Sequence, residues 1–417
     1  MSKKRILHFD LKTLVNYGDT LLFEAVKQVF NGFNNRESFL FYGSRNLRRP
    51  VGPQFVNQLN SNFDAVVVGG GGLFLKDANP NSVSGWQWNI RKELLEQINV
   101  PLILFAVGYN RFIGQEDFAP TFQDHLNRTI EKSAFVGLRN SGSINALQRY
   151  LPPSLHEKLI FQPCPTTISS YLFPDIFKGN LSANKRIAFQ ITFEDRHRLG
   201  GFDMIKLFRS AAEVIQKLQT ENWTVEVIVQ HSYHDVHFPE YLQKNGIDVP
   251  TVNLHTSPDG LYKHLEYYSD VPIVVGNRGH AQMIPFGIGG GIISILMHDK
   301  LAFFLDDIDH KHLGLNPNQE TFSSDLYRLI NLWGENFDQM RDALARKRKT
   351  LFETTMKNLG DISSKLGSDA SVNAVTPYTP FERDLSLCTF LASLERDDEG
   401  LRVDAMREKI AKVKQIL

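Results

Sequence analysis

Cysteine is scarce in this chain of 417 residues, which contains only Cys164 and Cys388. Two thiols cannot build a disulfide framework, and their spacing matches no common metal site. Charge of one sign is not in excess either, because Lys plus Arg and Asp plus Glu each total 46. We therefore expect no nucleic-acid partner, since nucleic acids are bound by strongly basic surfaces.

Long apolar runs are also missing, and none reaches the length needed to span a bilayer. The first residues, MSKKRILHFD, are positively charged but continue into a short strand pattern instead of the apolar core of a signal peptide. We therefore expect a cytoplasmic protein.

A metal site has one weak candidate. His231, His234 and His237 stand three residues apart in HSYHDVH. The segment follows a strand pattern and then meets Pro239, so the three rings need not share one face. We expect no metal and no resident cofactor, and among the three we expect His231, directly at the strand end, to face a binding cleft.

The chain is nevertheless long and rich in core-forming residues. Apolar residues make up 42% and charged residues 22%, which is ordinary for a globular protein. Single hydrophobic cores stop growing near ~250–300 residues, so more than one core is expected.

Residues 1–170 alternate short apolar runs with helical patterns. Between helices, six strands are predicted: RILHFD, SFLFYG, DAVVVGGGG, PLILFAVG, AFVGLRN and LIFQPC. A helix beginning near Asp19 places apolar residues on one face and ends near Gly32. This βαβ alternation predicts a mostly parallel sheet.

After a loop at about 163–184 the alternation restarts in residues 184–323. Five further strands are predicted: RIAFQITF, VEVIVQ, VPIVVGN, IISILM and LAFFLDD. We therefore predict an α/β fold of two Rossmann-like domains, each with its own core, facing across a cleft.

Residues 324–417 have a helical and charged pattern and form a predicted C-terminal extension. Helices are expected at about 336–359 and 380–395. The last segment, LRVDAMREKIAKVKQIL, has apolar residues at alternating spacings of three and four over two heptads. Packing on its own domains is favoured. A coiled-coil contact in a homo-oligomer and, because of its basic residues, a peripheral membrane contact stay open.

The most informative motif lies where strand 271–277 runs into Arg278, Gly279 and His280. Open α/β sheets bind ligands at the carboxyl edge of their strands. Arg278 offers a planar fork of donors for carboxylate or phosphate, and His280 can exchange a proton near neutral pH. The competing interpretation is a structural Arg paired with a nearby acid beside a structural His.

Other candidates lie at neighbouring strand ends of the second half. Arg196 and Arg198 follow RIAFQITF, at the same expected edge as Arg278. Gly289 and Gly290, within GIGGG, could offer backbone N–H groups to an anion.

The first half contributes candidates at the carboxyl ends of its own strands. Asn16 and Asp19 follow the first strand, and Asp19 could accept a hydroxyl proton or merely cap a helix. Gly71 belongs to a four-glycine run where a sugar or anion could approach the backbone, and Arg139 ends AFVGLRN.

Taken in this order, these segments resemble the polysaccharide pyruvyl transferase family. The matching residues are NYGD at 16–19, VVVGGGG at 66–72, FAVG at 105–108, GLRN-S at 137–141, and VVGNRGH with the glycine loop and Lys300 within 274–306. The R-x-H element is the most specific part. Asn140 departs from the family, which more often has an acid there, and the helical tail has no sharp family motif.

The resemblance implies a two-domain fold similar to GT-B glycosyltransferases. It also implies transfer of the pyruvyl unit of phosphoenolpyruvate onto two hydroxyls of a sugar, with formation of a cyclic ketal and release of phosphate. On this interpretation His280 is the acid, as an imidazolium, and Asp19 is the base. Arg278, with Arg196 or Arg198 and the glycine loop, holds phosphoenolpyruvate.

Two alternatives remain open at this point. A nucleotide-sugar glycosyltransferase on the same architecture would need an acid near the end of the second domain to bind a ribose, and Asp306 or Asp307 could serve. A non-catalytic sugar-binding subunit of a polysaccharide assembly complex would bind ligand without turnover.

Overall fold

The computed structural model describes residues 4–11, 16–33, 39–76, 82–176, 181–182, 184–254 and 261–368. The predicted helix at 380–395 and the heptad pattern at 401–417 lie outside these ranges. No helix in the described ranges combines the length and the apolar character needed to cross a bilayer.

The first half of the chain forms a parallel six-stranded sheet. Its strand order is β2 (Phe39–Asn46), β1 (Lys4–Asp10), β3 (Ala65–Phe74), β4 (Leu102–Tyr109), β5 (Phe135–Leu138), β6 (Leu159–Phe161). The helices among these strands are α1 (Tyr17–Phe33), α3 (Pro53–Asn62), α4 (Lys92–Glu96), α5 (Pro120–Lys132) and α6 (Ser141–Gln148). The direction of strand addition reverses between β1 and β3, which is where open α/β sheets bind ligands.

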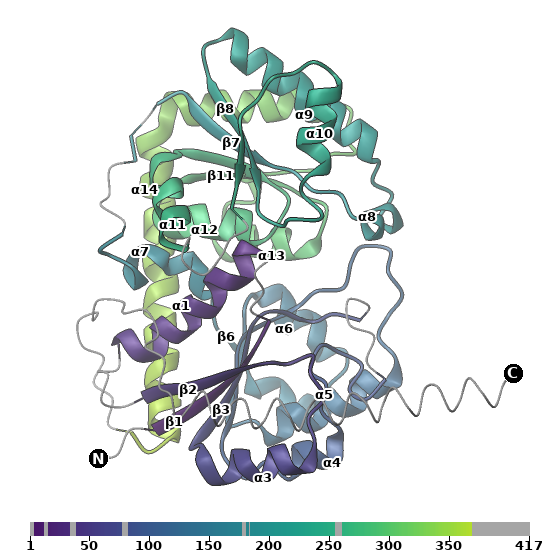
Figure 1. Ribbon diagram of the computed structural model, residues 1–417, viewed down its shortest axis with the longest axis vertical. Helices are drawn as coiled ribbons and strands as arrows, with labels where there is room; N and C mark the ends of the chain where they lie inside the picture. Colours follow the sequence, from purple (N-terminus) through teal and green to yellow (C-terminus); the bar gives the residue numbers. More distant parts are fainter. Residues whose placement is uncertain are drawn as a thin grey trace, which may run out of the picture.

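The second half repeats this plan. Its sheet has the order β12 (Gly314–Leu315), β11 (Gly291–Ile295), β10 (Ile273–Gly276), β7 (Arg186–Gln190), β8 (Thr224–Val229), β9 (Thr251–Asn253). The helices are α8 (Asp195–Leu199), α9 (Met204–Thr220), α10 (His237–Lys244), α11 (Leu261–Asp270), α12 (His280–Ile288) and α13 (Asp299–Asp307). The prediction of an α/β fold with two Rossmann-like, GT-B-like domains is confirmed, and Figure 1 shows one domain above the other with α1 at their junction.

One predicted strand is wrong. LAFFLDD forms helix α13, which His298 caps by accepting a hydrogen bond from the Lys300 N–H at 3.1 Å. Leu301, Phe304 and Leu305 are buried, and their spacing of three and four places them on one helical face. A short apolar run alone does not distinguish a strand from a buried helix.

The two domains share one core, and the first domain has a second core of its own. One cluster of buried apolar residues extends from α1 and β1 through the connecting helices η2 (Pro165–Ile168) and α7 (Ser169–Leu172) to the second sheet. A second cluster fills the other face of the first sheet. Gly287 of α12 permits this contact, because a Cβ there would lie 1.9 Å from the Thr166 carbonyl oxygen.

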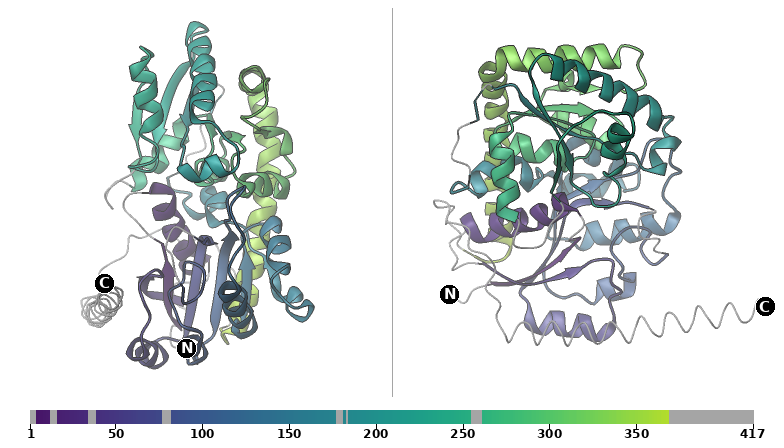
Figure 2. Two further views of the ribbon diagram at one scale, coloured as in Figure 1. Left: turned by 90° about the vertical axis from the view of Figure 1, so that its right-hand side faces the viewer. Right: turned by 45° about the horizontal axis from the view of Figure 1, so that its top comes forward.

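A long C-terminal helix fastens the domains together. α14 (Phe322–Lys365) bends at Asn336, where the backbone is non-helical, and runs beside both domains (Figure 2). Arg348 donates to the Phe286 carbonyl of the second domain at 2.7 Å, and Asn358 donates to the Phe161 carbonyl of the first at 2.8 Å. The described part of the extension, up to residue 368, is therefore helical, as predicted, and packs on both domains.

Candidate functional site

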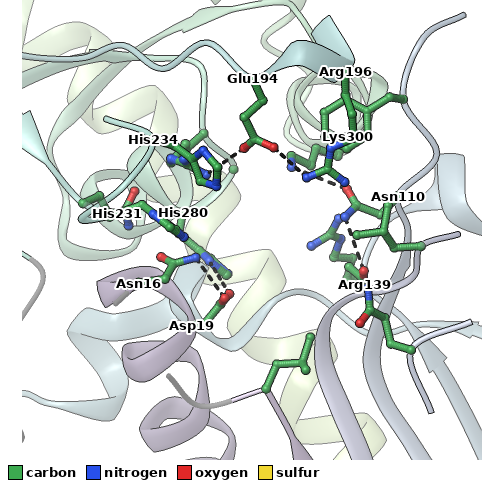
Figure 3. Close-up of a pocket in the computed structure, with 18 of the residues that line it drawn as sticks. Asn16, Asp19, Asn110, Arg139, Glu194, Arg196, His231, His234, His280 and Lys300 are labelled. Atoms are coloured by element: carbon green, nitrogen blue, oxygen red, sulfur yellow. Dashed lines mark hydrogen bonds and ion pairs between the residues drawn. The ribbon is translucent and has the colours of Figure 1, made fainter. Parts of the chain in front are cut away.

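The carboxyl edges of the two sheets face each other across a cavity of about 400 Å³. Both domains contribute to its wall, as Figure 3 shows. The lining residues are Leu11, Asn16, Asp19, Arg48, Gly72, Leu75, Gln87, Asn110, Phe112, Arg139, Glu194, Arg196, Gln230, His231, His234, Arg278, Gly279, His280 and Lys300. Five Arg or Lys side chains face two carboxylates here, so the pocket favours an anionic ligand.

Arg278 is held by acids of its own domain, as the structural interpretation of the sequence anticipated. Its Nε donates to Oδ1 of the fully buried Asp235 at 2.7 Å, and Nη2 donates to the Thr192 hydroxyl at 3.2 Å. Nη1 lies 3.5 Å from Glu194 Oε1. Arg278 lines the pocket, but most of its donors are already used within the protein.

Glu194 is an acid of the pocket that sequence reasoning missed. It precedes α8, and its Oε2 accepts a hydrogen bond from Arg196 Nη2 at 2.6 Å. Burial alone would raise the pKa of this carboxyl, but the guanidinium groups of Arg278 and Arg196 hold that pKa at about 2. Glu194 is therefore a permanent anion that joins two cations.

Arg196 and Arg198 have different surroundings in the structure, and only Arg196 lines the pocket. Arg196 lines the pocket and stacks over the Phe112 ring, with 4.3 Å between its Cζ and the ring centroid. Arg198 is absent from the pocket lining, and its half-exposed side chain lies 3.6 Å from Asp195. Because the two residues sit on a single turn of α8, they cannot both point into the cavity.

His280 begins α12 and is nearly buried. Burial, followed by the charges of Arg139, Lys300 and Arg278, lowers its pKa from 6.5 to about 3. The ring is therefore neutral without ligand, and the expected imidazolium would need the charge of a bound anion. Cations surround it before any anion is bound, and they oppose a further positive charge.

The two ring nitrogens of His280 face different partners. Nδ1 lies 3.8 Å from Asp19 Oδ1, and Nε2 lies 3.8 Å from the sulfur of the buried Cys164. Burial raises the pKa of the Cys164 thiol. A protonated thiol can donate weakly to a neutral ring or accept weakly from a charged one.

Asp19 is positioned by the residues just before α1. Its Oδ2 accepts a hydrogen bond from Asn16 Nδ2 at 2.9 Å, and Figure 3 shows its carboxylate directed toward His280. Asn16 forms an isolated antiparallel bridge with His231, which joins the two domains. Burial raises the pKa of Asp19, while nearby guanidinium groups such as Arg48 oppose the shift.

Gly18 makes room for this arrangement. A Cβ at position 18 would lie 2.6 Å from His280 Cβ, 2.7 Å from His280 Nδ1 and 2.8 Å from Gln230 Nε2. The backbone N–H of Tyr17 also donates to the Gln230 carbonyl at 3.1 Å. Only a glycine lets α1 start this close to the second domain.

On the other side of the pocket in Figure 3, Arg139, Asn110 and Lys300 lie together. Arg139 is 6% exposed, and no described residue accepts a hydrogen bond from its Nε or Nη2. Its guanidinium rests on Gly108, where a Cβ would lie 2.1 Å from Nε. A buried guanidinium without a partner in a pocket indicates an anionic ligand.

Lys300 approaches Arg139 from the second domain. Its Nζ donates to Asn110 Oδ1 at 3.4 Å, and Asn110 donates to the Gly72 carbonyl at 3.3 Å. Burial, followed by the charge of Arg139, lowers the pKa of Lys300 to about 7. An anion between Arg139 and Lys300 would relieve their repulsion.

The glycine predictions need correction. Gly289 ends α12 with φ = 105°, and Gly290 follows it. They lie at the far end of α12 from His280 and outside the pocket lining, so neither can offer an N–H group to a ligand there. Gly71 is also outside the lining. Strand β3 continues through the glycine run, and its neighbour Gly72 reaches the cavity.

The remaining candidates are placed as follows. Asn16, Arg139 and His231 line the pocket, together with His234. Asn140, the departure from the family pattern, caps α6 by accepting a hydrogen bond from the Ser143 N–H at 2.7 Å. Within the described ranges, no three His, Cys, Asp or Glu side chains come together in a way that could hold a metal ion.

Comparison with known proteins agrees with this architecture. The chain is similar to a protein from Listeria monocytogenes assigned as a UDP-N-acetylglucosamine 2-epimerase, with a TM-score of 0.52, 10% identity, and coverage of 91% of this chain and 100% of that one. It is also similar to MnaA of S. aureus in complex with UDP, with a TM-score of 0.51, 11% identity, and coverage of 90% and 100%. At these identities the likeness shows the fold alone.

Curated protein sequences gave no significant match. The family model described as polysaccharide pyruvyl transferase, however, matches residues 16–287. The matched range begins at Asn16 and contains Asp19, Arg139 and His280. This chain therefore belongs to the polysaccharide pyruvyl transferase family.

Proposed function

We propose that this protein transfers the pyruvyl group of phosphoenolpyruvate onto two hydroxyls of a sugar, in a surface polysaccharide or its precursor, and releases phosphate. The observation that carries the proposal is the pair formed by the buried Arg139 and the half-buried Lys300, whose charges act on His280 across the same pocket. Phosphoenolpyruvate concentrates a phosphate and a carboxylate in few atoms. It therefore needs several cations at short range, with a proton donor beside them.

The donor would bind with its anionic groups toward Arg139 and Lys300. The unsatisfied Nε and Nη2 of Arg139 can donate to two oxygens of one phosphate or carboxylate. Arg278 and Arg196 add positive potential, although Asp235 and Glu194 already engage their donors. In this proposal Arg139 is therefore the main contact of the donor, with Arg278 and Arg196 in supporting positions.

Ketal formation requires a proton at the methylene carbon C3, which makes C2 electrophilic. His280 is the donor in this proposal. Its pKa of about 3 applies to the empty pocket, where burial and cations keep the ring neutral. The negative charges of a bound phosphoenolpyruvate reverse that effect and favour the imidazolium.

Asp19 serves as the base for the first acceptor hydroxyl. As the hydroxyl oxygen bonds to C2, its proton passes to Asp19, and the bond between C2 and the phosphate oxygen breaks. The second hydroxyl then bonds to C2 and its proton leaves, which closes the cyclic ketal. Of the two hydroxyl protons, one replaces the proton that His280 gave to C3, and the other leaves on the released phosphate, so His280 and Asp19 are regenerated.

The nucleotide-sugar alternative has less support in this pocket. Asp307 accepts a hydrogen bond from the Ser141 N–H at 3.2 Å, and Asp306 pairs with Lys311 at 3.0 Å. Neither carboxylate lines the cavity, so neither is in place to hold a ribose. The similarity to MnaA, which was determined with UDP, concerns the fold.

The test is incubation of the protein with a panel of glycans and either phosphoenolpyruvate or nucleotide sugars. The proposal predicts liberated phosphate together with a pyruvyl ketal mass gain on a glycan. Release of a nucleotide with glycosyl transfer would establish the first alternative. Glycan binding without any turnover would establish a non-catalytic subunit.

A further inference from the structure

Gln230 is a polar residue of the pocket that sequence reasoning did not single out. It follows β8 directly, lines the cavity and is 0% exposed. Within the described part of the chain, neither its Oε1 nor its Nε2 has a hydrogen-bond partner. Buried amides are normally satisfied, so an unsatisfied one on a pocket wall indicates a ligand.

The backbone of Gln230 is fixed from both domains. Its N–H donates to Asp235 Oδ2 at 3.0 Å, and its carbonyl accepts the N–H of Tyr17 at 3.1 Å. The same Asp235 carboxylate holds Arg278 through its other oxygen. The main chain that carries the amide is therefore held in place from both domains, which favours a preorganised binding group.

The position of the amide identifies the part of the reaction it would serve. Gln230 Nε2 and His280 Nδ1 flank Gly18, whose Cβ would lie within 2.8 Å of both. Asp19 follows Gly18 directly, and its carboxylate lies 3.8 Å from His280 Nδ1. Gln230 thus borders the pair that exchanges protons, where the acceptor hydroxyls must lie.

The chemistry of the amide favours hydroxyl groups over anions. A primary amide has an acceptor and two donors, so it can accept from one hydroxyl and donate to the oxygen of a second. A phosphate or carboxylate would leave Oε1 without a donor. Arg139 has donors alone and suits an anion. Gln230 and Arg139 therefore match different substrates.

We propose that Gln230 binds the two acceptor hydroxyls, so that the second substrate presents a neutral sugar diol to Asp19 and His280 while Arg139 and Lys300 hold the donor anion. This assignment rests on the proposed function. It adds a residue that determines acceptor specificity and fixes the orientation of the two substrates in the pocket.

Thermal stability provides a test that is independent of turnover. Gln230→Met replaces an unsatisfied amide by an apolar side chain of similar length, so the Tm of the ligand-free protein should stay constant or rise. Gln162 is the matched control, since it is also 0% exposed but is bonded to Pro163, Thr355 and Asn358. Gln162→Met should lower the Tm. An equal loss in Gln230→Met would show a structural role and overturn the proposal.

Kinetics provide the second test, with methyl glycosides of glucose, galactose, mannose and N-acetylglucosamine as acceptors. Gln230→Met should raise the KM for the acceptor about 10–100-fold, as expected for lost hydrogen bonds to a hydroxyl pair, with the KM for phosphoenolpyruvate unchanged. A raised KM for phosphoenolpyruvate with an unchanged acceptor KM would place Gln230 at the donor and overturn the proposal.

The failure of the proposed function is distinguishable from the failure of this inference. If the wild-type protein turns over none of the glycosides, the proposed function fails for them. Ligand-observed NMR then compares glycoside binding by the wild-type protein and by Gln230→Met. Binding that is lost in the variant supports the inference, whereas equal binding or no binding by the wild type overturns it.

Discussion

His280 Nδ1 lies 3.8 Å from Asp19 Oδ1, although the two residues lie in the first turns of helices in different domains. Asn16 holds the second oxygen of Asp19, and the Cys164 sulfur faces the second nitrogen of His280. The pair is thus fixed by the contact between domains and not by either domain alone. Any change that separates α1 from α12 should disrupt it.

His280→Asn should abolish transfer and leave the fold intact, because the variant lacks the proton donor but remains neutral. Phosphate release measures the first effect. The folded-state pKa of His280 is lowered from 6.5 to about 3, so its neutral form contributes stability above pH 6.5. That contribution is lost as pH falls from 6.5 toward 3. The Tm of the variant should therefore fall less than that of the wild type as the pH is lowered across this range. Transfer activity retained by the variant would show that His280 is not the proton donor.

Gly18→Ala should inactivate the enzyme, since the added methyl group would collide with His280 and Gln230. The expected loss is at least about 100-fold in kcat/KM, as for a small misplacement of catalytic groups. Gly360 in α14 is the control, because a Cβ there meets nothing within 4 Å. Gly360→Ala should keep full activity. Equal activity of the two variants would contradict the packing described for Gly18.

Lys300→Arg should change the pH dependence of donor binding. Lys300 has a pKa of about 7 in the empty pocket and is charged below this value, so the affinity for phosphoenolpyruvate should fall as pH rises through about 7. A guanidinium stays charged over this range. The profile of kcat/KM for phosphoenolpyruvate should therefore lose its alkaline decline in the variant. An unchanged decline would assign it to another group.

Asp235→Asn should destabilise the protein, because it removes the nearer of the two carboxylates that pair with Arg278 and leaves only Glu194 at 3.5 Å. Breaking a buried ion pair in this way costs about 3–5 kcal/mol. Asp195 supplies the control, since its pair with Arg198 is solvent-exposed and its replacement by Asn should have no measurable effect. Urea unfolding midpoints of both variants provide the measurement. Similar midpoints would show that Asp235 does not stabilise Arg278.

Much of the fold follows from local patterns in the sequence. Most strands were recognisable because buried parallel strands have continuous apolar runs. The short, largely exposed strand β9 was not predicted. Helix α13 was mistaken for a strand, since LAFFL is too short to show its period. The shared core was also not predictable, because it depends on how closely Gly287 lets α12 approach η2.

The location of the site was predictable from the sequence, but the ion pairs among its side chains were not. Strand ends identified Asp19, Arg139, Arg278 and His280, since carboxyl edges gather in space. Side-chain geometry decides which cations are paired. Arg278 donates to Asp235, whereas Nε and Nη2 of Arg139 have no partner among the described residues. Gln230 gave no signal in the sequence. A glutamine at a strand end is common, and this one becomes informative only when the structure shows that its side-chain amide has no hydrogen-bond partner among the described residues.

The most direct test of pyruvyl transfer is the reaction of phosphoenolpyruvate with an acceptor glycan in deuterium oxide. Phosphate release and the mass of the product are measured together. We predict one ketal for each phosphate, with one solvent deuterium in each ketal methyl group, because C3 is protonated before C2 is attacked. Phosphate release without a ketal, or a ketal without deuterium, would contradict the account.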